Sequence, residues 1–330
     1  MNRDVPSLYE VYQQHFHIGA AVNPVTLKSQ KELLIKHFNS LTAENEMKFE
    51  SLQPEEGVFT FDNADNLIAF AKQHEKNVRG HTLVWHNQTP DWVFTNKDGS
   101  LVDRDTLLER MKTHISTVME RYKGDIYCWD VVNEVIADKG QQLLRDSKWT
   151  EIIGEDFIDK AFEFAHNADP NAALFYNDYN ESDPLKCEKI ITMIKGLVDR
   201  GVPIHGVGLQ AHWNIYSPTL DNIRKAIERY ASLGLQLHIT EMDVSVFDHE
   251  DKRTDLIAPT EEMLQRQTER YDSMFQLFRE YSDVITSVTF WGGADDYTWL
   301  NDFPVRGRKN WPFLFNENHQ PKSSFWKVID

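Results

Sequence analysis

Short apolar runs alternate with helical patterns along most of the chain. Strand-like runs rich in β-branched and aromatic residues occupy 16–22, 40–47, 77–85, 126–134, 172–178, 205–213, 235–243 and 285–293. Between them, apolar residues recur at the spacing of amphipathic helices. Eight strand–helix repeats in one chain predict a closed parallel (β/α)₈ barrel.

Two of the helical segments show the pattern clearly. In 103–122 the apolar residues lie on one stripe, and Asp103 or Asp105 is placed to cap the helix at its N-terminus. In 220–234 a similar stripe ends before Gly234, which stands where a C-terminal cap is expected.

No linker, low-complexity tract or shift in composition divides the chain, so we expect a single catalytic barrel domain over 1–330. The main alternative architecture is an open doubly wound sheet. That fold usually carries a glycine-rich phosphate loop after its first strand, and "GAAVNPVT" is not one.

Polar and aromatic side chains gather where the predicted strands end. In a parallel barrel these C-terminal ends form the active-site face. The residues at the strand ends include Glu44, Asn45, His81, Trp85, His86, Asn133, Glu134, Asn177, Asp178, Gln210, His212, Glu241, Asp243 and Trp291.

Two of these residues, Glu134 and Glu241, end the fourth and seventh strands. A pair of carboxyl groups on opposite walls of a pocket suits cleavage of a glycosidic bond, in which one protonates the leaving oxygen and the other acts at the anomeric carbon. The alternative is that either glutamate caps a helix or forms an ordinary ion pair.

His212 and Asp243 strengthen the catalytic interpretation. A histidine backed by an aspartate can hold a neighbouring carboxylate in one orientation and keep it ionised. Asn133, directly before Glu134, is placed to donate to a sugar hydroxyl, although it could instead satisfy the local backbone.

Trp85, Trp291 and Trp299 lie at or just beyond strand ends. Indole rings pack well against the apolar faces of pyranose rings, so these residues are candidate sugar platforms. The alternative is ordinary packing in the core or in loops.

Glu44, Asn45 and Lys48 form a dense polar group after the second strand. Such a group can hydrogen-bond several hydroxyls of one sugar. The alternative is a surface ion pair, which contributes little stability.

A metal site is not expected, and neither is any other cofactor. His15 and His17 form an H-x-H pair, but both precede "IGAAVN" and so lie at the N-terminal, non-catalytic end of the first strand. His81, His86 and His212 could supply three nitrogens, yet they lack the short fixed spacing of a zinc motif.

The net charge limits the kinds of binding partner that we expect, and the cysteine content indicates the cellular compartment. The formal charge of −17 argues against a nucleic acid or an anionic membrane as partner. Residues 1–15 carry no apolar signal core, and no run is long enough to span a membrane. Cys128 in a predicted strand and Cys187 on a predicted apolar helix face indicate no disulfide, so we expect a cytoplasmic protein.

The chain resembles glycoside hydrolase family 10, the (β/α)₈ endo-β-1,4-xylanases, over nearly its whole length. The segments that carry the resemblance, in order, are "TAENEMKFE", "RGHTLVWHNQTPDW", "WDVVNE", "YNDYN", "GVGLQAHW", "ITEMDV" and "TFWGGADDYTWL". The resemblance implies xylan or xylo-oligosaccharides as substrate and a retaining double displacement. Glu134 would be the acid/base and Glu241 the nucleophile, which His212 would orient with Asp243 behind it.

The resemblance also implies a set of sugar contacts. Asn133, His81 and Gln210 would contact the reacting ring, with Trp85 and Trp291 as walls; Glu44, Asn45, Lys48 and Gln88 would hold the next glycone sugar beneath Trp299; Tyr179 would lie on the leaving-group side.

Departures from the family pattern are few. Phe49 stands where many relatives have Trp, and no carbohydrate-binding module is attached. We therefore expect an intracellular enzyme acting on short imported oligosaccharides. The basic segment with Arg306, Arg308 and Lys309 either contacts an acidic substrate decoration or pins its own loop through salt bridges.

Two other functions remain open at this point: a catalytically silent sugar-binding barrel, and a metal-dependent barrel hydrolase. The oligomeric state is not predicted by the sequence.

Overall fold

In the computed structural model, which describes residues 4–330, parallel strands close into a barrel. The strands are β1 His17–Val22, β2 Ser40–Ala43, β3 Asn77–Val84, β4 Cys128–Asn133, β5 Ala173–Asp178, β6 Gly206–Leu209, β7 His212–Asn214, β8 Gln236–Ser245 and β9 Ile285–Phe290. The order is β6-β5-β4-β3-β2-β1-β9-β8-β7, and pairing of β6 with β8 closes the ring. The predicted (β/α)₈ barrel is confirmed.

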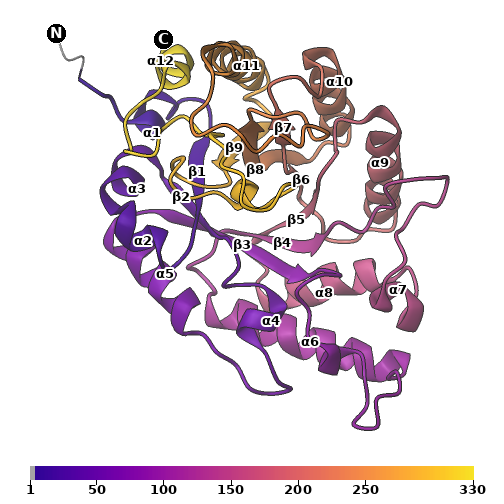
Figure 1. Ribbon diagram of the computed structural model, residues 1–330. Coiled ribbons are helices and arrows are strands. Elements are labelled where there is room, and N and C mark those ends of the chain that lie inside the picture. The colour runs from indigo at the N-terminus through magenta and orange to yellow at the C-terminus, as the bar shows by residue number, and fades with distance from the viewer. Residues whose placement is uncertain (1–3) are drawn as a thin grey trace.

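Helices surround the strands (Figure 1). They are α1 Leu8–Val11, α2 Thr26–Ser29, α3 Lys31–His37, α4 Phe49–Leu52, α5 Asp62–Gln73, α6 Arg104–Arg121, α7 Lys148–Ile152, α8 Phe157–Ala168, α9 Pro184–Asp199, α10 Leu220–Ala231, α11 Glu261–Glu280 and α12 Ser323–Ile329, with short 3₁₀ turns at Asp91–Val93 and Trp299–Asn301. Each long helix buries one apolar face against the strands, as the sequence pattern predicts.

The predicted sixth strand, 205–213, is two strands in the structure. Ala211 has φ +60°, a left-handed conformation that interrupts the extended chain between β6 and β7. Both short strands pair with β8, so together they fill one position of the barrel. The break turns the chain just before His212.

β2 and β9 end three or more residues before their predicted C-terminal ends, and β3 and β4 end one residue before theirs. β2 stops at Ala43, so Glu44 and Asn45 lie in the following loop, and β9 stops at Phe290, so Trp291 follows it. Glu44, Asn45 and Trp291 therefore lie in loops, just beyond the C-terminal ends of β2 and β9.

The helix ends agree with the sequence in most details. Asp103 caps α6 by accepting a hydrogen bond from the Thr106 N–H at 2.8 Å. Gly234 has φ +74° but lies beyond the C-cap residue of α10, Ser232. On α9, the spacing of apolar residues predicts that Val198 is buried with Cys187, but Val198 is 40% exposed.

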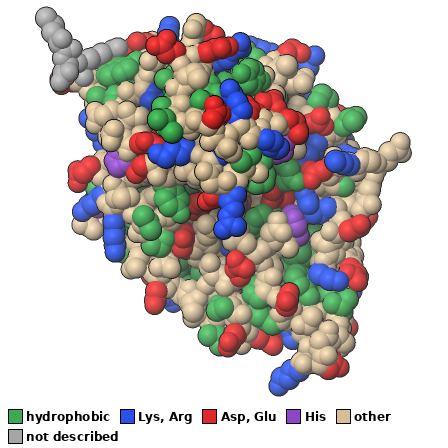
Figure 2. Space-filling model, viewed as in Figure 1, with side chains coloured by type: hydrophobic (Ala, Val, Ile, Leu, Met, Phe, Trp, Pro, Cys, Tyr) green, Lys and Arg blue, Asp and Glu red, His purple; other side chains and the backbone are tan. Residues whose placement is uncertain are grey.

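The surface and the chain ends complete the architecture. Acidic and basic side chains are interspersed over the face shown in Figure 2. The Tyr12 hydroxyl donates to the Val328 carbonyl at 2.5 Å and so joins the N-terminal segment to α12 (Figure 1). Cys128 and Cys187 are buried and free. Within residues 4–330 no helix combines the length and apolarity that crossing a membrane requires.

Candidate active site

Two asparagines connect the two candidate carboxyl groups. The Asn133 amide donates to Glu134 Oε2 at 3.0 Å, and the Asn177 amide donates both to Asn133 Oδ1 at 2.9 Å and to Glu241 Oε2 at 2.8 Å. Glu134 and Glu241 are only 9% and 6% exposed. The barrel thus brings together two carboxyl groups that the sequence places far apart.

The backbone presents Glu134 in an unusual conformation. Its φ of +59° is in the left-handed region, directly after β4. The neighbouring strand holds this turn: the Glu134 N–H donates to the Asn177 carbonyl at 2.9 Å and the Val135 N–H donates to the Tyr176 hydroxyl at 3.0 Å. Arg145 Nε donates to the Glu134 carbonyl at 2.6 Å. These bonds aim the Glu134 side chain into the mouth of the barrel.

A histidine and an aspartate support Glu241. His212 Nε2 lies 3.0 Å from Glu241 Oε1, and its Nδ1 lies 2.9 Å from Asp243 Oδ1. Burial alone would lower the pKa of His212, but Asp243 and Glu241 raise it well above its usual value, which favours the protonated ring. The indole of Trp299 donates to the other Asp243 oxygen at 2.8 Å.

The environments of the two glutamates push their pKa values apart. Burial raises the pKa of Glu134 to about 8, and the negative charges of Asp178 and Glu241 add to the increase. Burial also acts to raise the pKa of Glu241, but the hydrogen bond and charge of His212, with Lys48, lower it overall. At neutral pH the pair holds one proton, on Glu134. This arrangement can supply one acid and one nucleophile.

A buried ion pair fixes His81 beside Glu241. His81 Nδ1 lies 2.8 Å from Asp130 Oδ2, and Arg79 donates to both Asp130 oxygens at 2.8 and 3.1 Å. The other ring nitrogen of His81 is 3.8 Å from Glu241 Oε2, and the ring meets Trp291 edge to face with centroids 5.4 Å apart. His81 therefore faces the space above Glu241.

In the polar group after β2, Lys48 joins Asn45 to Gln88, and Glu44 has a separate partner. Lys48 Nζ donates to Asn45 Oδ1 at 2.9 Å and to Gln88 Oε1 at 3.0 Å, and it lies 4.8 Å from the centre of the Trp85 ring. Glu44 accepts from the Asn23 amide at 3.0 Å. Lys48 is 7% exposed, so this is not a surface ion pair. Gln210 lies further inside, and its amide donates to Asn133 Oδ1 at 3.3 Å.

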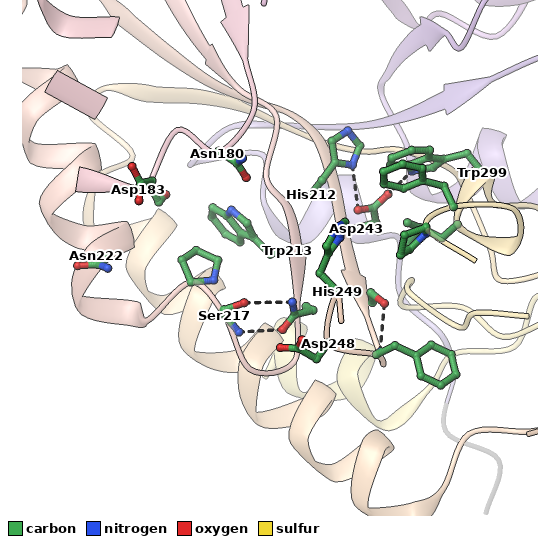
Figure 3. Close-up of a pocket in the computed structure, with 18 of the residues that line it drawn as sticks. Asn180, Asp183, His212, Trp213, Ser217, Asn222, Asp243, Asp248, His249 and Trp299 are labelled. Atoms are coloured by element: carbon green, nitrogen blue, oxygen red, sulfur yellow. Dashed lines mark hydrogen bonds and ion pairs between the residues drawn. The ribbon is translucent and has the colours of Figure 1, made fainter. Parts of the chain in front are cut away.

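A cavity of about 380 Å³ opens on the other side of His212 (Figure 3). His212, Asp243 and Trp299 form its inner wall, while Asn180 and Asn222 line the opposite side. The Trp299 ring stacks on Phe303 with centroids 4.7 Å apart, which fixes the indole at the edge of this cavity.

Tyr179 is held by charged neighbours. Its hydroxyl accepts from Arg145 at 3.1 Å and donates to Asp138, and Lys186 Nζ lies 3.6 Å from the centre of its ring. Arg145 also donates to the Glu134 carbonyl, so it links Tyr179 to the turn at Glu134 through two hydrogen bonds.

Sequence reasoning singled out neither Asn177 nor the Arg79–Asp130 pair as functional. Asn177 appears at a strand end in the sequence, but nothing there indicates that it contacts two other site residues. For Arg79 and Asp130 a signal was available, because each is a charged residue inside an otherwise apolar strand, where charges are buried only when paired.

The histidines do not converge as metal ligands. His17 begins β1, at the end of the barrel away from the glutamates, while His81 and His212 each pair with an aspartate. No group of three His, Cys, Asp or Glu residues among 4–330 has the arrangement of a metal site.

The basic segment after β9 mainly holds its own loop. Arg308 is 3% exposed, donates to the carbonyls of Asp251 and Arg253, and lies 3.8 Å from the centre of the Phe247 ring. Of the expected salt bridges of this segment, the described residues 4–330 contain one, between Lys309 and Glu317 at 3.3 Å. Arg308 therefore holds this segment mainly through the backbone carbonyls of Asp251 and Arg253 and the ring of Phe247.

Comparison with known proteins places the molecule in a family. The family model described as "Glycosyl hydrolase family 10" matches residues 7–330. The chain belongs to glycosyl hydrolase family 10. It is 63% identical over 332 aligned residues to an endo-1,4-beta-xylanase of Geobacillus stearothermophilus, with all of both chains covered. It is 57% identical to endo-1,4-beta-xylanase B of Paenibacillus barcinonensis, covering 100% of this chain and 99% of that one.

Solved family 10 structures agree with the fold. Xylanase XynB from Paenibacillus barcinonensis, in complex with a conduramine derivative, superposes with a TM-score of 0.98 at 57% identity and covers 99% of each chain. A Thermobacillus composti GH10 xylanase superposes with a TM-score of 0.90 at 55% identity, covering 98% of this chain and 99% of that one. The family resemblance seen in the sequence is confirmed.

Proposed function

We propose that this family 10 chain is a retaining endo-1,4-β-xylanase that cleaves internal bonds of xylan fragments and xylo-oligosaccharides. One observation carries the proposal: a chain 63% identical to an endo-1,4-beta-xylanase holds two linked carboxyl groups, one kept protonated and the other ionised. A silent sugar-binding protein would not need this division of protonation.

In the first step Glu241 attacks the anomeric carbon. An ester bond forms between the Glu241 carboxylate and that carbon while the bond to the leaving oxygen breaks. Glu134 gives its proton to that oxygen, so the leaving sugar departs as a neutral alcohol. The raised pKa of Glu134 provides the proton at neutral pH.

In the second step Glu134, now a carboxylate, takes a proton from water. The hydroxide attacks the anomeric carbon, the ester to Glu241 breaks, and Glu134 is protonated again. Two inversions at one carbon give net retention. His212 and Asp243 are proposed to support Glu241 in both steps, since His212 binds the carboxylate that forms and breaks the ester.

The remaining residues are proposed as sugar contacts. Asn133, His81 and Gln210, with Trp85 and Trp291, surround the reacting ring; Glu44, Asn45, Lys48 and Gln88 hold the next glycone sugar, with Trp299 over that region; Tyr179 borders the leaving-group side. Support for these roles comes from their convergence around Glu134 and Glu241.

Three wider features belong to the same proposal. Residues 4–330 form one catalytic domain, and residues 1–3 of the expected domain 1–330 lie outside the described residues. Neither nucleic acid nor membrane is a partner, and the protein acts in the cytoplasm. Two free buried cysteines and the net charge of −17 support this view. Assay of the cytoplasm and the medium of the native host tests it, and activity only in the medium would contradict it.

Azide rescue tests the two glutamate roles. Glu241→Ala should lose turnover by about 10⁴-fold or more, and azide should give only a product of inverted configuration. Glu134→Ala should slow natural substrates far more than dinitrophenyl glycosides, which need no proton, and azide should give a product of retained configuration. Glu163→Ala, which removes a partly exposed carboxylate on α8, is the control and should keep full activity.

A further inference from the structure

Glu181 is a buried acid that the proposed mechanism does not use. It lies in the loop between β5 and α9 and is 1% exposed. Its Oε1 accepts a hydrogen bond from the Ala211 N–H at 3.0 Å, while its Oε2 has no hydrogen-bond partner among residues 4–330. A buried carboxyl group with one partner is costly, so its retention calls for a function.

Ala211, the partner of Glu181, forms the break between β6 and β7. It is a non-glycine residue with φ +60° and is fully buried. The Ala211 carbonyl accepts from the N–H groups of Trp213 at 3.0 Å and Asp243 at 3.3 Å. Its N–H has Glu181 as acceptor, so the carboxyl group completes the hydrogen bonding of a strained turn.

Both neighbours of Ala211 reach Glu241. On one side, the Gln210 carbonyl accepts from the Glu241 N–H at 3.0 Å. On the other, His212 Nε2 lies 3.0 Å from the Glu241 carboxylate. A shift of the Ala211 turn therefore moves the backbone and the side-chain support of Glu241 together.

We propose that Glu181 is a positioning residue for the nucleophile: by holding the Ala211 turn, it sets the orientation of His212 against Glu241. The inference rests on the proposed function, in which Glu241 attacks the anomeric carbon. Burial raises the pKa of Glu181 to about 7. Both protonation states keep an acceptor oxygen, so the hydrogen bond to Ala211 persists through that titration.

Three variants test the proposal. Glu181→Leu removes the acceptor at similar volume, and Glu181→Gln keeps an acceptor oxygen without the charge. Tyr230→Phe is the matched control, because the Tyr230 hydroxyl donates at 2.8 Å to the backbone carbonyl of Glu181 and not to its side chain. Tyr230→Phe removes one hydrogen bond to the loop that carries Glu181, but it keeps the hydrogen bond from the Ala211 N–H to the Glu181 side chain.

The measurement is the pre-steady-state rate of glycosylation by dinitrophenyl β-xylobioside, whose good leaving group removes the need for the Glu134 proton. A 2-fluoro analogue first labels the wild-type protein, and mass spectrometry locates the label. We expect the label on Glu241, a glycosylation rate about 10- to 100-fold lower in Glu181→Leu, and rates within about threefold of wild type in Glu181→Gln and Tyr230→Phe. KM should change little.

The outcomes separate the two proposals. A label on a residue other than Glu241 would overturn the proposed function. A label on Glu241 combined with wild-type glycosylation in folded Glu181→Leu would overturn the positioning role alone. Equal rate losses in Glu181→Leu and Tyr230→Phe would also overturn it, since general loosening of the loop would then explain both. If Glu181→Leu does not fold, a glycosylation rate more than threefold below wild type in folded Glu181→Gln would overturn the proposal, because that variant keeps the acceptor oxygen for the Ala211 N–H.

Discussion

Asn177 lies between two carboxyl groups, one protonated and one ionised at neutral pH. Its amide donates to Glu241 and to Asn133, which in turn donates to Glu134, so one oxygen of each glutamate, Oε2, has an amide partner. Neutral amides satisfy these oxygens without adding charge. Burial acts to raise the pKa of both glutamates; the charge of Asp178 adds to this for Glu134, while His212, His81 and Lys48 outweigh it for Glu241.

This difference predicts the pH dependence of kcat/KM on unactivated xylo-oligosaccharides. Activity needs Glu241 ionised and Glu134 protonated. Because the pKa of Glu241 is lowered from 4.5, the acid limb should lie below pH 4.5. Because the pKa of Glu134 is raised to about 8, activity should fall as the pH rises through about 8.

Glu134→Gln provides the control for the alkaline limb. With a dinitrophenyl substrate, the glycosylation rate of this variant should show no loss near pH 8, while the acid limb stays. If the glycosylation rate of Glu134→Gln still falls near pH 8, a group other than Glu134 causes that loss.

At the scale of elements, the sequence predicts the strands well and the break between β6 and β7 poorly. Apolar runs locate strands because parallel strands in a barrel are buried on both faces. The left-handed conformation of Ala211 has no such signal, because alanine does not favour it and no glycine or proline marks the turn. Tertiary hydrogen bonds, including the one from Ala211 to Glu181, impose it.

The same distinction holds for the site. Residues at strand ends could be selected from the sequence because the barrel brings all those ends to one face. The pairing of Arg79 with Asp130 depends on the register of β3 and β4, where Arg79 aligns with Cys128 and His81 aligns with Asp130. An apolar pattern does not determine register between strands, so these contacts required the structure.

Two glycines provide a test of packing at this scale. A Cβ on Gly206 in β6 would lie 2.1 Å from the Phe175 ring, which is enclosed in the barrel. Gly206→Ala should therefore lower the free energy of unfolding by about 1–3 kcal/mol. On α9, a Cβ on Gly196 meets only the end of the flexible Arg200 side chain at 2.9 Å.

Gly196→Ala should raise the free energy of unfolding by about 0.5–1 kcal/mol, because alanine favours the helix. Urea denaturation of both variants checks the pair. A Gly206→Ala variant as stable as wild type would mean that Phe175 can move aside.

At the scale of the whole molecule, closure of the barrel creates the site. β4 and β8 bring Glu134 and Glu241 from distant parts of the chain, and β5, between them in the ring, supplies Asn177. The two ends of the chain also meet: Tyr12 donates to the Val328 carbonyl and accepts from Arg279 at 2.5 Å. This contact joins α11 and α12 to the N-terminal segment.

Tyr12→Phe should lower the free energy of unfolding by about 1–3 kcal/mol, because the Val328 carbonyl then keeps only the long 3.5 Å hydrogen bond from Arg279, and Arg279 loses the Tyr12 hydroxyl as acceptor. Tyr9→Phe changes a partly buried ring in the same segment and should have a smaller effect. Equal midpoints of urea denaturation for wild type and Tyr12→Phe would show that the contact between the chain ends adds no stability.

The stereochemistry of hydrolysis tests the central claim most directly. Proton NMR of xylohexaose digestion, followed through the first minutes, resolves the anomeric signals and the product lengths. We expect the β-anomer to appear first, in oligomers from internal cleavage, because Glu241 forms an ester that water then opens. First appearance of the α-anomer would contradict the account, since Glu241 would then activate water instead of attacking the sugar.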